Sequence, residues 1–193
     1  MVTYYNPQKK NALNEFCYHL TTLINEENAY SKDIVIVCIG SDRATGDCLG
    51  PLIGDKLSKY GTSFHVYGTL NEPVHAKNLT KTLHTIKSNY KKPFIIAIDA
   101  SLGKEDHIGM MTLGSGPLKP GLGVKKKLPE VGDLHITGIV NSSHDMESST
   151  LQTTRLSIIF QIADAIVLAL RIFNDDYYIQ QAPELSYLLS QTS

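Results

Sequence analysis

The stretch Ile34-Val35-Ile36-Val37-Cys38-Ile39 decides the fold of this 193-residue chain. Its residues are apolar and mostly β-branched, with no polar residue at alternate positions. That pattern is typical of a strand buried on both faces, as in a parallel sheet. A second run of the same character, Phe94–Ile98, ends at Asp99. Two such strands predict a central sheet that is covered by helices on both sides.

Helical and strand-like segments alternate along the rest of the chain. Apolar residues three and four positions apart predict helices over Asn11–Asn28, Leu49–Tyr60, Ala76–Ser88 and Leu151–Phe173. Further strands are predicted over Phe64–Tyr67, Ile108–Leu113 and Leu134–Val140, with a long loop over Gly114–Gly132. This order predicts an α/β fold of three layers, α/β/α, with a largely parallel central sheet.

We expect a single domain over residues 1–193. Its core spans about 33–173, its N-terminal helix 11–28 and its C-terminal tail 174–193, in which a short helix is expected.

Composition and charge exclude several classes of protein. The chain is 42% hydrophobic and 19% charged, which is ordinary for a globular protein. With 18 basic and 19 acidic residues the net charge is −1, so no direct binding to nucleic acid or to an anionic membrane is expected. The most apolar segment, Leu156–Phe173, contains Gln161, Asp164 and Arg171, and no membrane span is predicted. Three cysteines without metal-ligand spacing and a polar N-terminus predict a reducing, cytoplasmic location.

The loop after the first buried strand, Gly40–Pro51, is the first candidate site, because ligands of open α/β sheets bind at the carboxyl ends of the strands. It is not a phosphate-binding P-loop. Gly40 and Gly46 are one residue too far apart for GxxxxGK[ST], and Asp47 stands in place of the lysine. Asp47 is therefore either a residue stabilised by the start of the next helix or a functional carboxylate.

The second candidate carboxylate is Asp99, at the end of the other buried strand. If the two strands are neighbours, Asp47 and Asp99 face one another across the carboxyl edge of the sheet. Paired carboxylates share a proton as an acid/base dyad, or supply oxygen ligands to a divalent metal. The spacing alone leaves both uses open. Cys48 is interpreted as a small core residue rather than as a thiol nucleophile.

Several motifs resemble those of the bacterial spore germination protease. Gly46–Pro51 resembles its D-x-L-G-P motif, and Ala97–Ala100 resembles its second aspartate motif. Pro120–Val124 resembles its Pro-Gly-x-Gly segment, and Gly138–Val140 falls where that family has Gly-Val-Pro.

A closer resemblance is to the YyaC-type spore protease family (DUF1256). It is carried by Val37–Arg43, His65–Leu70, Gly116–Gly121 and Leu128–Asp133, and it covers roughly residues 33–172. The layout also resembles, more distantly, that of hydrogenase-maturation endopeptidases. These families share a phosphorylase/hydrolase-like α/β/α fold, which the resemblance therefore implies for this chain.

The resemblance implies a sporulation-associated endopeptidase in which Asp47 and Asp99 are the catalytic pair and no cofactor is needed. It implies a protein or peptide substrate, with small acid-soluble spore proteins as candidates, in the cytoplasm of a forespore or mother cell. The matching motifs also supply the candidate substrate-binding residues: Gly40, Asp42, Gly46, Gly50, Pro120, Gly121 and Gly123.

Two alternatives stay open beside this hypothesis. The first is a metal-binding protein of the hydrogenase-maturation type, with Asp47, Asp99 and His135 as ligands and His144 as the second candidate histidine. The second is a non-catalytic sporulation protein that binds a partner with the same fold. A homo-oligomer is compatible with each of these hypotheses.

Overall fold

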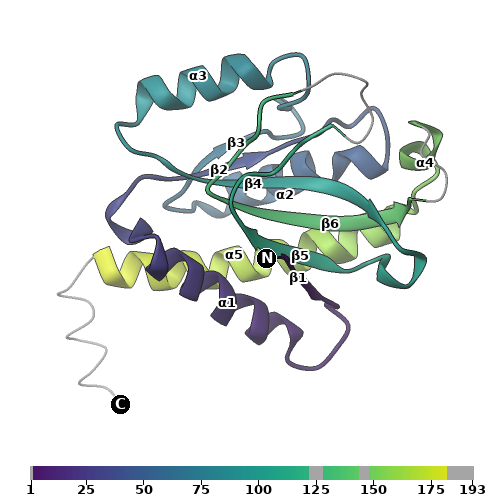
Figure 1. The fold of residues 1–193 in the computed structure, drawn as a ribbon, viewed down its shortest axis with the longest axis horizontal. Coiled ribbons are helices and arrows are strands. Elements are labelled where there is room, and N and C mark those ends of the chain that lie inside the picture. Colours follow the sequence, from purple (N-terminus) through teal and green to yellow (C-terminus); the bar gives the residue numbers. More distant parts are fainter. Residues whose placement is uncertain (1, 122–127, 144–147, 182–193) are drawn as a thin grey trace.

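The computed structural model describes residues 2–121, 128–143 and 148–181, and Figure 1 shows a central sheet with helices on both sides. The elements follow in the order β1 (Val2–Tyr5), α1 (Ala12–Glu26), η1 (Ala29–Ser31), β2 (Ile34–Cys38), η2 (Gly46–Cys48), α2 (Leu49–Tyr60), β3 (His65–Tyr67), α3 (Leu79–Asn89), β4 (Phe94–Gly103), η3 (Glu105–His107), β5 (Met111–Ser115), β6 (Leu134–Ser142), α4 (Ser148–Gln152) and α5 (Leu156–Gln181).

The six strands form one mixed, mostly parallel sheet in the order β1-β5-β6-β4-β2-β3. Strands β3, β2, β4 and β6 run parallel to one another, whereas β5 pairs antiparallel with β6 and β1 antiparallel with β5. The predicted α/β/α class is therefore confirmed. The two strands that carry the aspartate motifs, β2 and β4, are direct neighbours, as the site hypothesis requires.

The sheet separates two apolar cores because successive side chains of a strand point to opposite faces. One face of β2 and β4, through Ile36 and Ile98, packs under α1, α2 and α5. The opposite face, through Val37 and Ala97, packs under α3. Full burial of both faces explains why these strands have continuous apolar sequences.

The structure differs from the predicted elements in the points below, besides shifts of a few residues at the ends of the predicted helix Ala76–Ser88 and the predicted strand Ile108–Leu113. The N-terminal residues expected to precede the first helix form the edge strand β1, whose pairing with β5 is a long-range contact that local periodicity does not encode. Strand β4 continues past Asp99 to Gly103, because β6 pairs with it over that length. The helix predicted over Leu151–Phe173 begins at Leu156, is separate from α4, and continues as α5 to Gln181, where the described residues end.

Helix α5 contains a 24-residue segment, Leu156–Ile179, that is long and apolar enough to cross a membrane by length and composition. Of the most apolar window in that segment, 44% is buried inside the protein. Ile162, Ile166 and Leu170 are fully buried against the sheet and its neighbouring helices. These contacts make one side of α5 part of the core.

Candidate functional site

The loop between β2 and α2 holds Asp47 in a fixed position. The main-chain N–H of Ser41 donates a hydrogen bond to Asp47 Oδ2 at 2.8 Å and also lies 3.1 Å from the Asp47 carbonyl oxygen. The Asp47 N–H in turn donates to the Ala44 carbonyl at 3.0 Å. The loop thus closes on itself, and Asp47 lies half-buried just before the first turn of α2.

Two glycines of the motif are required by close packing. Gly40 has φ of 133°, and a Cβ there would lie 2.0 Å from the Asp47 carbonyl oxygen. A Cβ at Gly50 would lie 2.1 Å from the carbonyl oxygen of Ile39. Helix α2 therefore approaches the end of β2 more closely than a residue with a side chain at position 50 would allow. These glycines therefore fix where Asp47 lies relative to the sheet.

Asp99 lies inside β4, one residue beyond the end of its pairing with β2. On its other side it is opposite Thr137 of β6. Its side chain is 7% exposed, and Oδ1 accepts a hydrogen bond from the Ala100 N–H at 2.8 Å. Because β2 ends at Cys38, Asp99 has a paired strand only on the β6 side, although β4 itself continues to Gly103.

Asp47 and Asp99 line the same cavity, which has a volume of about 330 Å³. The structure therefore brings together the two carboxylates predicted from the sequence. The remaining lining is largely apolar and also includes the cationic side chains of Arg43 and Lys77. The lining residues are Ile39, Gly40, Ser41, Arg43, Ala44, His75, Ala76, Lys77, Ala100, Pro120, Gly121, Leu128, Leu151 and Gln152.

Burial and mutual charge separate the two carboxyl groups chemically. Burial raises the pKa of Asp99 well above its usual range, and the nearby Asp47 charge raises it further. Burial also raises the pKa of Asp47, but the Ser41 hydrogen bonds and the charge of His75 oppose that rise. Asp99 therefore holds a proton to higher pH than Asp47 does. Two carboxyl groups of unequal pKa in a single cavity are an arrangement that general acid/base chemistry uses.

The histidine predicted to join the carboxylates, His135, does not do so. Its Nδ1 lies 2.9 Å from the Gly116 carbonyl oxygen, and its ring lines a different hollow with Thr112 and Thr137. The ring belongs to β6, opposite Ala97, on the upstream side of Asp99. The metal-ligand set with His135 is therefore wrong as predicted. His144 lies outside the described residues, and no cluster of three potential ligands occurs within 2–121, 128–143 and 148–181.

The histidine that lines the cavity is His75, to which the sequence analysis gave no role. It belongs to the segment between β3 and α3, which is joined to the end of β2 by an isolated bridge between Ile39 and Val74. The Gly40 N–H donates to the Val74 carbonyl at 2.8 Å. No short motif surrounds His75 in the sequence, so only this long-range pairing identifies it.

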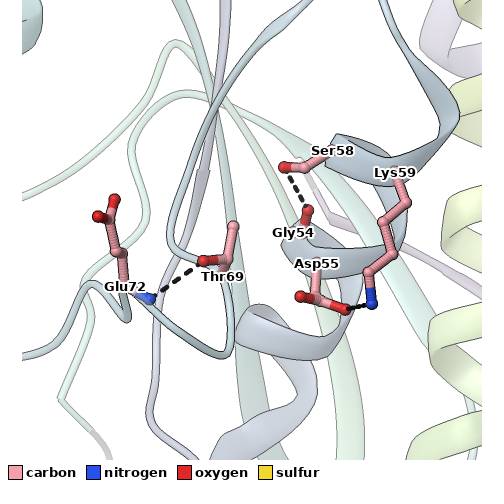
Figure 2. A network of polar contacts seen from close by, with 6 residues as sticks. All are labelled: Gly54, Asp55, Ser58, Lys59, Thr69 and Glu72. Atoms are coloured by element: carbon pink, nitrogen blue, oxygen red, sulfur yellow. Dashed lines mark hydrogen bonds and ion pairs between the residues drawn. The ribbon is translucent and has the colours of Figure 1, made fainter.

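The same segment packs closely against α2 and has a closed turn of its own. A Cβ at Gly54 of α2 would lie 1.9 Å from the Gly68 carbonyl oxygen. Figure 2 shows Gly54 on α2 beside the turn in which Thr69 Oγ1 accepts a hydrogen bond from the Glu72 N–H at 3.1 Å. This packing sets the position of the cavity wall that carries His75.

The predicted substrate-binding residues divide into three groups. Gly40, Pro120 and Gly121 line the cavity. Gly46 and Gly50 are buried, Asp42 is exposed, and none of the three is among the residues that line the cavity. Gly123 lies outside the described residues.

Cys48, next to Asp47, is not part of the cavity lining. Its Sγ lies 2.9 Å from the Thr45 carbonyl oxygen, and burial raises the pKa of its thiol. Both features disfavour the reactive thiolate that a nucleophile requires.

Fold and cavity together define a class of protein: an α/β/α protein with two carboxyl groups at the carboxyl edge of a mostly parallel sheet. Residues 3–169 match the family described as "Protein of unknown function (DUF1256)", and the chain belongs to this family. The chain is 55% identical over 139 residues to the "Uncharacterized protein YyaC" of Bacillus subtilis (strain 168), which covers 72% of this chain and 68% of that protein.

Among solved structures, a [NiFe] hydrogenase maturation protease, HycI from Thermococcus kodakarensis KOD1, is similar at a TM-score of 0.41 and 18% identity. The match covers 72% of this chain and 93% of that one. A similarity of this size does not transfer an activity.

Proposed function

We propose that this protein is an endopeptidase that hydrolyses peptide bonds with Asp47 as general base and Asp99 as general acid. The observation that carries the proposal is the placement of both carboxyl groups in one cavity with unequal burial. The resemblance of Gly46–Pro51 and Ala97–Ala100 to the germination protease motifs supports the same assignment.

The reaction follows from the two protonation states. Asp47 takes a proton from water as the water oxygen bonds to the peptide carbonyl carbon, and Asp99 gives its proton to the carbonyl oxygen. The C–N bond of this tetrahedral intermediate then breaks. The leaving nitrogen takes the proton from Asp47, and the carbonyl oxygen returns its proton to Asp99, so both groups regain their starting states.

The apolar walls support this division of roles. Ala100, Leu128 and Leu151 give the cavity an apolar lining, and in such surroundings the neutral form of a carboxyl group is favoured. Asp47 keeps the main-chain hydrogen bond that stabilises its ionised form. The proposal extends to a cytoplasmic role in sporulation, with small acid-soluble spore proteins as candidate substrates.

The test is cleavage of a purified small acid-soluble spore protein by the wild-type chain, Asp47→Asn and Asp99→Asn, followed by mass spectrometry. Each asparagine variant should lower kcat at least about 100-fold, because one proton transfer is lost while the size of the side chain is kept. Asp106→Asn, at a side chain that is 77% exposed, is the matched control and should cleave normally. Equal rates for wild type and both aspartate variants would refute the mechanism.

Parallel assays with EDTA separate this mechanism from the metal-dependent alternative. Cleavage that persists in EDTA agrees with the acid/base pair. Cleavage that is lost in EDTA and restored by a divalent metal would instead favour metal-dependent hydrolysis.

A further inference from the structure

We propose that the hollow over β6, β5 and β1 continues the Asp47–Asp99 cavity as one substrate groove, and that it binds about four extended peptide residues on one side of the cleaved bond. This hollow, which His135 also lines, has a volume of about 600 Å³. The inference rests on the proposed function, because it takes a peptide as the substrate of the cavity. It adds a binding surface that neither aspartate motif contains and that reaches the edge strand β1.

The first observation is a row of side chains that crosses the sheet from Asp99 to the sheet edge. Asp99 of β4 is opposite Thr137 of β6. Thr137 is opposite Thr112 of β5, which is in turn opposite Tyr4 of β1. Side chains of directly opposite residues lie on the same face of a sheet. Because Asp99 lines the cavity and the other three line the hollow, the two spaces follow one another along one face.

The second observation is that two chain segments line both spaces. On β4, Ala100 lines the cavity and the next residue, Ser101, lines the hollow. In the segment after β5, Leu118 lines the hollow and Pro120 lines the cavity. Main-chain hydrogen bonds of 2.7 Å and 2.9 Å join Leu118 to Val131 and fix this wall. An extended peptide that lies in the cavity therefore passes into the hollow between walls that continue from one to the other.

The third observation is the chemistry of the floor. Ser101 Oγ donates to Thr137 Oγ1 at 3.1 Å, and Thr112 Oγ1 lies 2.7 Å from Thr137 Oγ1. Thr112 and Thr137 are 4% and 7% exposed. The hydroxyl groups are thus paired with one another, so the floor requires no particular polar group from a ligand. Such a floor accepts peptide segments of different sequence.

The walls of the hollow combine apolar and basic side chains. Val2 and Leu118 offer apolar contacts, and Lys104 and His107 offer hydrogen-bond donors or ionisable groups. An extended peptide suits both kinds of wall, because its side chains pack on apolar groups while its main-chain carbonyls accept hydrogen bonds. These requirements favour a peptide segment as the occupant.

Tyr4 marks the far end of the row. Neighbouring strands lie about 4.8 Å apart, so the three steps from β4 to β1 cover roughly 14 Å. An extended peptide advances about 3.3 Å per residue, which gives about four residues over this distance. Tyr4 is 51% exposed, and its ring centre lies 4.8 Å from that of His107. Its ring is therefore placed to pack on the last of these peptide residues.

Tyr4→Thr tests the far end of the groove without weakening β1, because threonine keeps the preference for extended backbone. With a small acid-soluble spore protein as the probe, we expect Tyr4→Thr to raise KM about fivefold with kcat nearly unchanged. Tyr4→Phe, which keeps the ring, should retain the wild-type KM. The control is Tyr18→Ala on α1, which lies on the other side of the sheet and is 78% exposed there. Equal KM values for wild type and Tyr4→Thr, or equal rises at Tyr4 and Tyr18, would overturn the proposal.

Shortened peptides measure the length of the groove. Once mass spectrometry has located the cleaved bond, synthetic peptides that span it are shortened one residue at a time from each end. On one side, KM should rise with each removal within about four residues of the bond. Tyr4→Thr should have no further effect on a peptide that lacks the fourth residue, because the two changes remove the same contact. A full effect of Tyr4→Thr on that shortened peptide would contradict the placement of the peptide.

Binding measured without cleavage distinguishes failure of this inference from failure of the proposed function. The same spore protein is titrated calorimetrically into Asp99→Asn, alone and combined with Tyr4→Thr or with Tyr18→Ala. Weaker binding with Tyr4→Thr alone, without cleavage by any chain, would support the groove and refute the peptidase. Equal affinity in the three proteins, or no binding by any of them, would overturn the groove.

Discussion

Asp99→Asn should make the protein more stable at neutral pH while it removes the proposed activity. The buried Asp99 carboxyl group has a pKa well above its usual range, so the folded protein holds this proton to higher pH than the unfolded chain does. Asparagine keeps the size of the side chain and an oxygen that can accept from the Ala100 N–H, but it never ionises. The substitution therefore removes only the part of the free energy of unfolding that depends on the ionisation of Asp99.

The sign and size of the effect follow from proton linkage. Below about pH 4 Asp99 is protonated in both states and adds no pH dependence. Between pH 4 and the raised pKa of the folded state, the unfolded chain binds fewer protons, so the free energy of unfolding falls as pH rises. The slope for one carboxyl group is up to about 1.4 kcal/mol per pH unit. Above the raised pKa the free energy of unfolding of the wild type stops falling on account of Asp99. The difference in stability between Asp99→Asn and the wild type then stays at its maximum.

Urea unfolding and thermal melts from pH 4 to pH 8 measure this difference. For a chain of this length, about 1.4 kcal/mol corresponds to a rise in Tm of about 3–6 °C. Asp47, whose pKa is also raised, adds to the slope in both proteins, so the difference between them reports Asp99. Asp106→Asn, at a side chain that is 77% exposed, is the control and should follow the wild type. Parallel curves for wild type and Asp99→Asn over this range would refute the reasoning.

Two further predictions concern the motif around Asp47. Gly50→Ala should lower the free energy of unfolding by about 3 kcal/mol in urea titrations, because its Cβ would lie 2.1 Å from the Ile39 carbonyl oxygen; a loss below about 1 kcal/mol would contradict this packing. Cys48→Ala should cleave at the wild-type rate in the spore-protein assay, because Sγ points to the Thr45 carbonyl oxygen rather than to the cavity. Complete loss of cleavage in a folded Cys48→Ala protein would instead support a thiol nucleophile.

Local sequence signals predicted the parts of the fold that depend on local burial. The continuous apolar runs at Ile34–Ile39 and Phe94–Ile98 predicted two central parallel strands, and the structure places them side by side. The spacing in Leu49–Tyr60 predicted α2 with the bounds observed. These signals are reliable because burial on both faces of a strand, or on one face of a helix, requires an apolar residue at each buried position.

Pairings between distant segments were not predictable in the same way. The antiparallel edge strand β1 and the extension of β4 to Gly103 both depend on partners far along the chain. The polar N-terminal segment and the sequence after Asp99 contain no periodic pattern from which pairing with β5 or β6 could be predicted. Strand ends are set by how far the neighbouring strand continues, which is a property of the sheet and not of either segment.

The sequence by itself determined the class of fold, the family resemblance and the two candidate carboxylates, because each aspartate follows a buried apolar run that is visible in the local pattern. Tertiary structure alone decided which histidine lies beside them. His135 lies in another hollow. His75 lines the cavity because the bridge between Ile39 and Val74 joins its segment to the end of β2. Side chains meet in a site through the pairing of distant backbone segments, and that pairing is fixed only when the whole sheet forms.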